Sequence, residues 1–388
     1  MIKTEYDIVV VGGGPAGSRF AAGASRKNDV LLLEENYEIG KPVQCSGLVS
    51  PRVIEMSGLR SWHNTIRSVN FYSPGGVHFA IEGDSIKGYV IDRSGLDIAL
   101  AERAARSGAE IMLGSTFVGA EREGRKLKIH FRKMGELREV RCSLLVGADG
   151  MSSTVSRTFG LSRYSEIVSC VQSDAYVPSL NESDAVSLYF GSETAPGFFA
   201  WAIPGKEFTR IGLGITSGSR TAAEYYERLL ARLGGGKTLN LTAGPIPLGN
   251  RGRMVADNVM LVGDAAGHVK PISGGGIFTS MAAADLAASV AAEAFACGDM
   301  SARVLSRYEK EWNRGIGREL ERGALVRRIF LQMNDGNLDS LFRTLEESRI
   351  KDLLSRGDID YPTELSPLVL SRAPSLLRFS PQLIRALM

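Results

Sequence analysis

The sequence predicts an α/β fold in which three separated segments build one parallel sheet, with an antiparallel-sheet second domain inserted between them and helices at the C-terminus. Apolar runs at residues 7–11, 144–146 and 259–262 each lead into a glycine-containing loop, as buried parallel strands do. The chain between these runs is strand-rich. Its 388 residues are long for a single hydrophobic core, so two domains are expected.

Composition is that of a soluble globular protein, with 44% hydrophobic and 23% charged residues. The net charge of +3 is too small to indicate a nucleic-acid partner. Four scattered cysteines without a CxxC pair, and histidines without ligand spacing, predict no metal site, cluster or disulfide framework. We therefore expect a reducing, cytoplasmic compartment. The apolar stretch 276–297 contains Asp285 and Glu293, which favours a buried helix over a membrane span.

The first βαβ unit carries a glycine-rich loop. Strand 7–11 is followed by GxGxxG at residues 12–17, a helix over 15–27 and a second strand over 30–33. Gly12 permits the tight turn, Gly14 lets the backbone approach a diphosphate, and Gly17 lets helix and strand pack closely. An acid at the end of the second strand is expected to bind ribose hydroxyls; Glu34 is favoured, with Glu35 as the alternative. The unit predicts dinucleotide binding, by NAD or FAD.

Two later segments distinguish these cofactors. Residues 145–150 (LVGADG), with Ser152, Ser153 and Arg157 after them, match the second fingerprint of flavin hydroxylase-like folds. Residues 261–267 (LVGDAAG) match the third, in which Asp264 would bind a ribityl hydroxyl. Three fingerprints in order predict FAD, held in a two-dinucleotide fold of the p-hydroxybenzoate hydroxylase type. Asp149 is expected to brace a turn and not to contact the flavin.

Two further elements are expected at the flavin. The loop containing Gly275, Gly276 and Ile277 precedes the apolar helix, and its backbone amides would face the pyrimidine edge and stabilise negative charge there. Arg93 opens a helix predicted over 93–107, where this fold class brings an arginine to the cofactor. The alternative for Arg93 is an ion pair with Asp92 or Asp97.

The remaining segments complete the predicted organisation. Residues 67–91 suggest antiparallel hairpins, 110–146 a β-meander, and 165–250 a strand-rich, aromatic region. Beyond residue 301 the chain is helical, with a core-facing stripe formed by Val304, Tyr308, Trp312, Ile316 and Leu320. We therefore expect three regions: an FAD-binding domain (1–60, 92–160 and 250–300), a substrate domain (61–91 and 161–249) and a C-terminal helical region (301–388).

Two motifs resemble those of the geranylgeranyl reductase family. Residues 42–47 (PVQCSG) resemble its PxxxCSG element, and residues 196–204 (PGFFAWAIP) resemble its PxxYxWxFP motif. With the three fingerprints, the chain resembles the archaeal members that reduce digeranylgeranylglycerophospholipids, over roughly residues 6–290. Phe199 and Ile203 depart from the motif, replacing a tyrosine and a phenylalanine. A proton donor at the tyrosine position is therefore absent, and the motif is expected to form an apolar wall.

The resemblance implies that reduced FAD saturates the isolated double bonds of geranylgeranyl chains on a glycerophospholipid. It implies Cys45 as a catalytic residue that positions substrate or assists proton transfer; the alternative is a small buried hydrophobe. It implies substrate contacts by Phe199, Trp201 and Pro204. The cofactor-binding residues then are Gly12, Gly14, Ala16, Gly17, Glu34, Glu35, Cys45, Ser46, Gly47, Arg93, Val118, Asp264, Gly275, Gly276 and Ile277.

Such a lipid substrate implies contact with a membrane, because pulling a twenty-carbon chain into water costs on the order of 15 kcal/mol. The segment from Pro367 is apolar and carries Arg372, Arg378 and Arg385 without an acid, which suits peripheral contact with anionic lipid. Its prolines argue against a single amphipathic helix, and a helical cap of the fold is equally consistent. The electron donor is not indicated; a reduced pyridine nucleotide, a ferredoxin and a deazaflavin remain open.

Three other functions compete with this one. An FAD-dependent monooxygenase of an aromatic or isoprenoid substrate shares the fingerprints but does not predict the cysteine element or the Trp motif. A quinone-linked electron-transfer flavoprotein needs cluster-binding cysteines, and only Cys297 lies beyond residue 170. A lipid carrier that retains FAD as a relic would bind lipid without turnover.

Overall fold

The structure is a computed structural model that describes residues 3–161, 164–181, 183–249, 252–348 and 350–387. The first layer is an eight-stranded sheet. Six of its strands follow the order β17-β18-β11-β1-β2-β8, and β10 pairs with β11 and with β9. The strands β11, β1, β2 and β18 pair in parallel, as predicted from their apolar runs. Their bounds are β1 Glu5–Val11, β2 Val30–Leu33, β8 Glu110–Met112, β9 Ser115–Glu123, β10 Lys126–Lys133, β11 Glu136–Gly147, β17 Val255–Ala256 and β18 Val259–Leu261.

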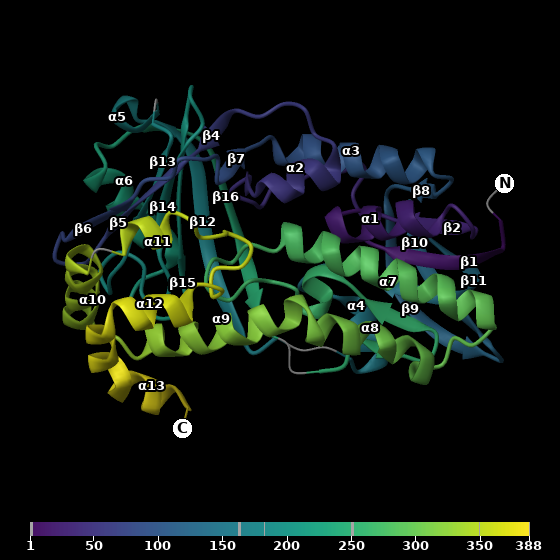
Figure 1. Cartoon of the computed structure of the whole chain (residues 1–388). Helices are drawn as coiled ribbons and strands as arrows, with labels where there is room; N and C mark the ends of the chain where they lie inside the picture. The colour runs from purple at the N-terminus through teal and green to yellow at the C-terminus, as the bar shows by residue number, and fades with distance from the viewer. Residues whose placement is uncertain (1–2, 162–163, 182, 250–251, 349, 388) are drawn as a thin grey trace.

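Helices cover this sheet and fill the first core. Helix α1 (Pro15–Ala24) packs between α3 (Arg93–Arg106) and α7 (Ile277–Cys297), as Figure 1 shows. Among the described residues, α7 is long and apolar enough to cross a membrane by length and composition. Its alanine-rich face is instead buried in the core, with Ala283, Ala284 and Ala287 fully inaccessible. This agrees with the predicted core helix. The short α4 (Thr154–Phe159) and the 3₁₀ turn η1 (Gly263–Ala266) follow β11 and β18.

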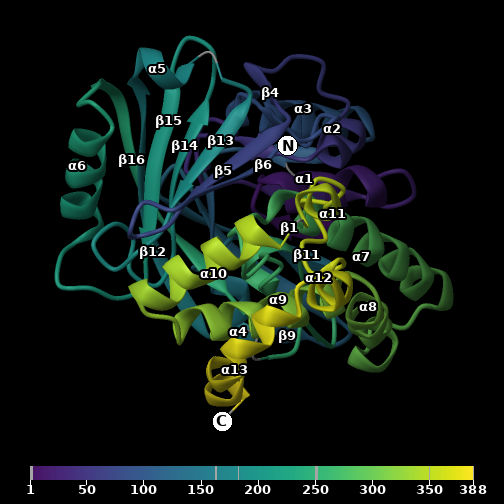
Figure 2. The same ribbon diagram turned by 60° about the vertical axis from the view of Figure 1, so that its left-hand side comes forward.

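The second layer is a seven-stranded sheet in the order β16-β12-β15-β14-β13-β5-β6. It is antiparallel, as predicted for the second domain, except that β13 and β5 run in parallel. Helix α6 (Ala222–Arg232), with α5 (Pro178–Asn181) nearby, packs on one face, and the C-terminal helices lie towards the other (Figure 2). The strands are β5 Ser68–Tyr72, β6 His78–Ile81, β12 Glu166–Tyr176, β13 Ala185–Tyr189, β14 Ala200–Pro204, β15 Thr209–Ile215 and β16 Lys237–Leu248.

A three-stranded sheet and α2 (Pro51–Ser57) connect the two layers, with strands β3 Leu48–Val49, β4 Asn64–Ile66 and β7 Gly88–Val90. The predicted core stripe after residue 301 is confirmed, but it spans two helices, α8 and α9, because the chain turns at Gly315. The C-terminal elements are α8 Ala302–Arg314, α9 Ile316–Leu331, α10 Asp335–Glu347, α11 Lys351–Leu354, α12 Ser366–Arg372, η2 Pro374–Phe379 and α13 Ser380–Leu387. The predicted domain boundaries remain a proposal.

Candidate active site

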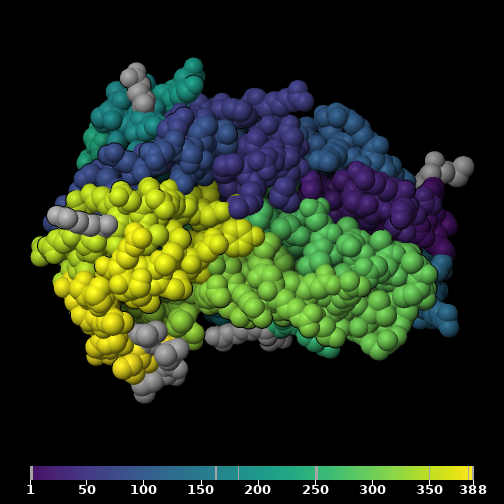
Figure 3. Space-filling model, viewed as in Figure 1, coloured from purple at the N-terminus to yellow at the C-terminus, as the bar shows by residue number. Residues whose placement is uncertain are grey.

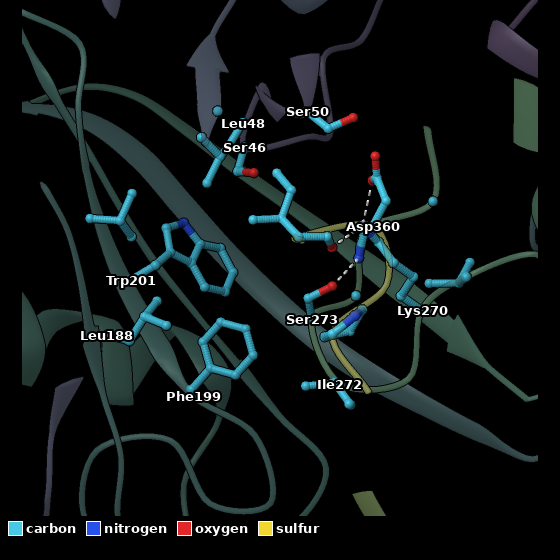
Figure 4. A pocket seen from close by; sticks show the side chains of 18 of the residues that line it. Ser46, Leu48, Ser50, Leu188, Phe199, Trp201, Lys270, Ile272, Ser273 and Asp360 are labelled. Atoms are coloured by element: carbon cyan, nitrogen blue, oxygen red, sulfur yellow. Dashed lines mark hydrogen bonds and ion pairs between the residues drawn. The ribbon is translucent and has the colours of Figure 1, made fainter. Parts of the chain in front are cut away.

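A cavity of about 1110 Å³ lies between the glycine loops of the parallel sheet and the open face of the seven-stranded sheet. Figure 4 shows Phe199, Trp201 and Leu188 on one side of it and Lys270 with Asp360 on the other. The cavity brings together eleven residues that the sequence predicted for the site. These are Gly14, Ala16, Cys45, Ser46, Arg93, Phe199, Trp201, Asp264, Gly275, Gly276 and Ile277.

The first glycine loop is shaped for a diphosphate. Gly12 has φ of +102°, and a Cβ there would lie 2.3 Å from the carbonyl oxygen of Ala148. A Cβ on Gly17 would lie 1.9 Å from the carbonyl oxygen of Gly12, so helix and loop touch only because both residues are glycine. By contrast, a Cβ on Gly14 would meet nothing within 4 Å, because this residue faces the cavity. The open space above Gly14, at the start of α1, fits the approach of a phosphate group.

Glu34 is buried beside this loop at the end of β2. Its Oε2 accepts a hydrogen bond from Gly13 N at 2.7 Å, and its Oε1 accepts from the backbone and side chain of Asn36 at 2.9 and 2.8 Å. The carboxylate is therefore held at the position expected for ribose recognition.

The structure corrects the expected positions of two other residues. The side chains of Glu35 and Val118 are exposed and do not line the cavity. In strand β9 the alternation of side chains buries Phe117 and leaves Val118 44% exposed. Neither side chain faces the cavity, and their predicted cofactor contacts stay proposals.

Asp264 and Arg93 offer polar groups to the cavity. Burial raises the pKa of Asp264, an effect that the nearby Arg93 guanidinium opposes. No described residue donates a hydrogen bond to the Asp264 carboxylate, which is left for a ligand hydroxyl. Arg93 Nη2 lies 2.9 Å from Asp97 Oδ1, so the predicted helix-start ion pair also forms. Its Nε is buried without a hydrogen-bond partner in the described chain. These groups fit the ribityl chain and flavin of FAD.

A lysine that the sequence did not single out lies at the loop before α7. Lys270 Nζ donates to Ile359 O at 2.8 Å and pairs with Asp360 Oδ1 at 3.0 Å (Figure 4). A Cβ on Gly275 would lie 3.2 Å from Lys270 Cε, so the lysine stem packs directly against the glycine loop. The C-terminal region thereby contributes an acid and a carbonyl to the wall of the site.

The loop containing Cys45 is tied to the seven-stranded sheet. Gln172 Nε2 donates to Cys45 O at 2.9 Å, and Arg210 Nη1 donates to Ser46 O at 2.7 Å. Arg210 is itself held by both carboxylate oxygens of Asp174, at 2.6 and 3.1 Å. Cys45 lines the cavity, and its Sγ accepts a hydrogen bond from Gly47 N at 3.4 Å. Cys45 is thus positioned by β12 and β15, the floor of the chamber.

The Trp motif presents alternate side chains to the cavity. Phe199, Trp201 and Ile203 line it, whereas Pro204 does not. The predicted substrate contact of Pro204 is therefore wrong: the two-residue period of β14 turns it to the opposite face. Its carbonyl instead accepts a hydrogen bond from Asn64 Nδ2 at 3.0 Å.

Gly212 on β15 leaves room for the indole ring of Trp201. A Cβ on Gly212 would lie 2.6 Å from both Gln172 Cβ and Trp201 Cε2. The indole therefore lies across β15 beside Gln172. The chamber has a further set of apolar lining residues, namely Val69, Phe71, Ile81, Val186, Leu188, Ile246, Ile272, Ile329 and Met333.

Two polar residues, one in the second fingerprint and one directly after the third, stabilise the fold. Asp149 accepts from Ser153 Oγ at 2.6 Å and from Val155 N at 3.1 Å, which confirms the predicted turn role. His268 is buried and accepts from Gly263 N through Nδ1 at 3.1 Å, so its proton lies on Nε2, 3.3 Å from Tyr308 Oη. His268 therefore supports the third glycine loop from beneath.

Burial lowers the pKa of His268 to about 3. Between pH 6.5 and 3 the unfolded chain takes up a proton that the native imidazole does not. The stability contributed by neutral His268 is therefore present above pH 6.5 and is lost as pH falls, by about 2 kcal/mol at pH 5. We expect urea unfolding at pH 7 and 5 to show that His268→Gln loses about 2 kcal/mol less than wild type over this interval. Equal losses in the two proteins would contradict this assignment.

Comparison with known proteins agrees with this geometry. A family model described as FAD binding domain matches residues 84–322. Digeranylgeranylglycerophospholipid reductase 2 of Methanothermobacter thermautotrophicus is 37% identical, over 93% of this chain and 98% of that protein. The corresponding reductase of Methanocaldococcus jannaschii is 32% identical over 98% of both chains. The chain belongs to the digeranylgeranylglycerophospholipid reductase family.

Solved structures place this reductase-family chain in the predicted fold. A geranylgeranyl bacteriochlorophyll reductase-like protein from Thermoplasma acidophilum superposes with a TM-score of 0.87 at 25% identity, covering 98% of this chain and 99% of that one. A flavin-dependent halogenase shares the fold with a TM-score of 0.71 at 17% identity, over 97% of this chain and 78% of its own. The predicted FAD cofactor, the oxidoreductase class and the hydroxylase-type fold are thus confirmed.

Proposed function

We propose that this reductase saturates the isolated double bonds of geranylgeranyl chains on a glycerophospholipid. The observation that carries the proposal is the continuity of one cavity from the FAD-binding loops, at Gly14 and Asp264, into a chamber with many apolar lining side chains, Leu188 and Trp201 among them. Its relatives are named for this substrate class, and they match over nearly their whole length. When bound and reduced, FAD supplies the hydride equivalent for the reaction.

The chamber suits an alkene that has no carbonyl to polarise it. Reduction adds a hydride to one alkene carbon and a proton to the other, with positive charge developing between them. Phe199 and Trp201 turn aromatic rings to the cavity and are 6.1 Å apart between ring centroids. Aromatic faces stabilise a cation in a dry site and offer no nucleophile to trap it. Phe199 lacks the hydroxyl of the related tyrosine and therefore acts only through its ring.

We assign Cys45 to the reacting end of the chamber. Gln172 and Arg210, both on the seven-stranded sheet, donate hydrogen bonds to the loop that contains Cys45 and hold this loop beside the cavity. A thiol in this position can orient the alkene or transfer a proton towards it. Because a buried cysteine can also serve as a small hydrophobe, Cys45→Ser and Cys45→Ala together separate the two roles. We expect both variants to retain FAD and to change either turnover or the number of bonds reduced.

Electrons and substrate reach the enzyme from outside this chain. A reduced pyridine nucleotide, ferredoxin or deazaflavin would reduce the bound FAD, since no second GxGxxG is present in the sequence. A geranylgeranyl lipid resides in a bilayer, and moving each chain into water costs on the order of 15 kcal/mol. We therefore propose a cytoplasmic enzyme that associates peripherally with the membrane.

The test is anaerobic incubation of dithionite-reduced holoenzyme with a digeranylgeranyl phospholipid, followed by mass spectrometry of the lipid. The expected product gains mass in two-hydrogen steps. A product that forms only in oxygen and gains one oxygen atom would identify a monooxygenase instead. Lipid that binds without any change in mass would indicate a carrier.

A further inference from the structure

The cavity reaches the molecular surface among the C-terminal elements. Val326 of α9, Leu370 of α12 and Leu377 of η2 line the cavity and are also 39%, 46% and 61% exposed. Side chains that are both cavity wall and outer surface mark its mouth. Leu368 of α12 and Ile384 of α13 add exposed apolar surface beside it, at 50% and 59%. We call these five residues the mouth patch.

Consecutive elements form this patch. Helix α12 contacts η2, η2 contacts α13, and α13 packs on α9. Figure 3 shows the C-terminal elements, in yellow, as a continuous surface at one end of the molecule. The apolar side chains are therefore neighbours around one opening and not scattered surface leucines.

The chain leading into α12 is held by hydrogen bonds and an ion pair to α9 and to the loop before α7. Buried Thr363 donates its N–H and Oγ1–H to the Glu319 carboxylate at 2.7 and 2.5 Å. Asp360, 1% exposed, pairs with Lys270. These contacts fix the position of the mouth relative to the loop before α7.

The C-terminal segment that forms most of the patch carries basic side chains and no acidic ones. Arg372 and Arg385 are exposed, and within the described chain neither guanidinium lies within ion-pair distance of a carboxylate. On α9, Arg322 and Arg328 are also exposed, together with one acid, Glu321. Arg378 differs, because it donates to Ser340 O and Thr344 Oγ1 and so attaches η2 to α10. Residues 366–388 contain no Asp or Glu, and the nearest exposed acid along the chain is Glu364.

We propose that the mouth patch docks on an anionic lipid bilayer and that substrate chains enter the cavity between Leu370 and Leu377. The inference rests on the proposed function, because it requires a substrate that lies in the membrane. Apolar residues ringing the opening would sit among acyl chains, while Arg372 and Arg385 would lie at the anionic headgroups. Basic side chains near an anionic surface are attracted to its headgroups. A lipid chain could then pass from bilayer to chamber without crossing water.

The experiment measures sedimentation of the full-length FAD-loaded protein with vesicles of phosphatidylglycerol and phosphatidylcholine. The variants are Leu368→Glu/Ile384→Glu and Arg372→Glu/Arg385→Glu, all at exposed positions outside the cavity wall. The matched control is Leu239→Glu/Leu241→Glu on β16, whose side chains are 65% and 59% exposed. We expect each mouth-patch variant to lower vesicle affinity by about 10-fold or more, because one reverses two charges and the other replaces two apolar side chains with carboxylates. The control should bind as wild type does.

Equal binding by wild type and both mouth-patch variants, or no binding by wild type, overturns the docking proposal. Loss of a dimer in these variants, with vesicle binding intact, would assign the patch to a second copy of the chain and also overturn it. A parallel assay with lipid in vesicles and in detergent micelles separates this failure from failure of the function. We expect the variants to lose about 10-fold activity on vesicles only. If wild type reduces lipid in neither form, the proposed function is wrong, whatever the vesicle binding shows.

Discussion

Replacing Gly14 with alanine is expected to weaken FAD binding by roughly 10- to 100-fold while leaving the stability of the FAD-free protein unchanged. Gly14 has an extended backbone (φ −69°, ψ −174°) that alanine adopts without strain. Its added Cβ would meet no protein atom within 4 Å and would project into the cavity. The methyl group would then occupy the space through which a phosphate reaches the backbone N–H groups. Flavin-fluorescence titration and thermal unfolding of the apoprotein measure the two quantities.

Two other glycines of the same segment provide controls. A Cβ on Gly23 would lie 3.2 Å from Ala288 Cβ, a contact that a small shift relieves, so Gly23→Ala should retain both FAD and stability. Gly17→Ala should lose both, because its Cβ would lie 1.9 Å from Gly12 O. If Gly14→Ala binds FAD as wild type does, the diphosphate does not lie on this loop.

Replacing Leu188 with aspartate is expected to lower lipid turnover by about 100-fold or more while retaining FAD. Leu188 lies on β13 between Trp201 of β14 and Phe71 of β5, and its side chain faces the chamber (Figure 4). A carboxylate there would lose its water when a lipid chain entered, and neither neighbouring ring carries a charge to compensate it. Steady-state reduction of a digeranylgeranyl lipid and the flavin absorbance of the purified protein measure the two effects.

The matched control is Leu188→Met, which keeps the volume and the apolar surface of the side chain. We expect its turnover to stay within a few-fold of wild type, since core exchanges of this kind cost little. If Leu188→Asp turns over lipid normally, the substrate does not pass along β13, and the chamber proposed for it is wrong.

The glycine loops were predictable because their requirements are local. A tight turn, a close helix contact and an open approach each demand glycine at a fixed spacing, and Gly12, Gly14 and Gly17 satisfy them in the structure. The strand-level details were less accessible. The two-residue alternation of a strand divides the side chains of β14 between two faces but does not say which face lines the cavity. Pro204 was therefore placed in the cavity wall, although its side chain is on the other face.

The polar residues that position the site could not be found from the sequence. Gln172 and Arg210 donate hydrogen bonds to the loop containing Cys45, which lies 127 and 164 residues earlier in the chain. Lys270 forms an ion pair with Asp360, 90 residues further along. Single polar residues within strands or loops carry no periodic signal, so only the folded chain reveals these pairings. Similarly, the arginines after Pro367 suggested lipid contact, but the mouth of the cavity among Leu370 and Leu377 is a tertiary feature.

The most direct test of the account is an anaerobic titration of the dithionite-free, reduced holoenzyme with lipid, followed by flavin absorbance. Digeranylgeranyl phospholipid should restore the oxidised flavin spectrum in proportion to the double bonds lost, and its fully saturated counterpart should not. A reduced flavin that ignores both lipids and reoxidises only when oxygen is admitted would contradict the claim that the chamber beside the FAD site is where the alkene is reduced.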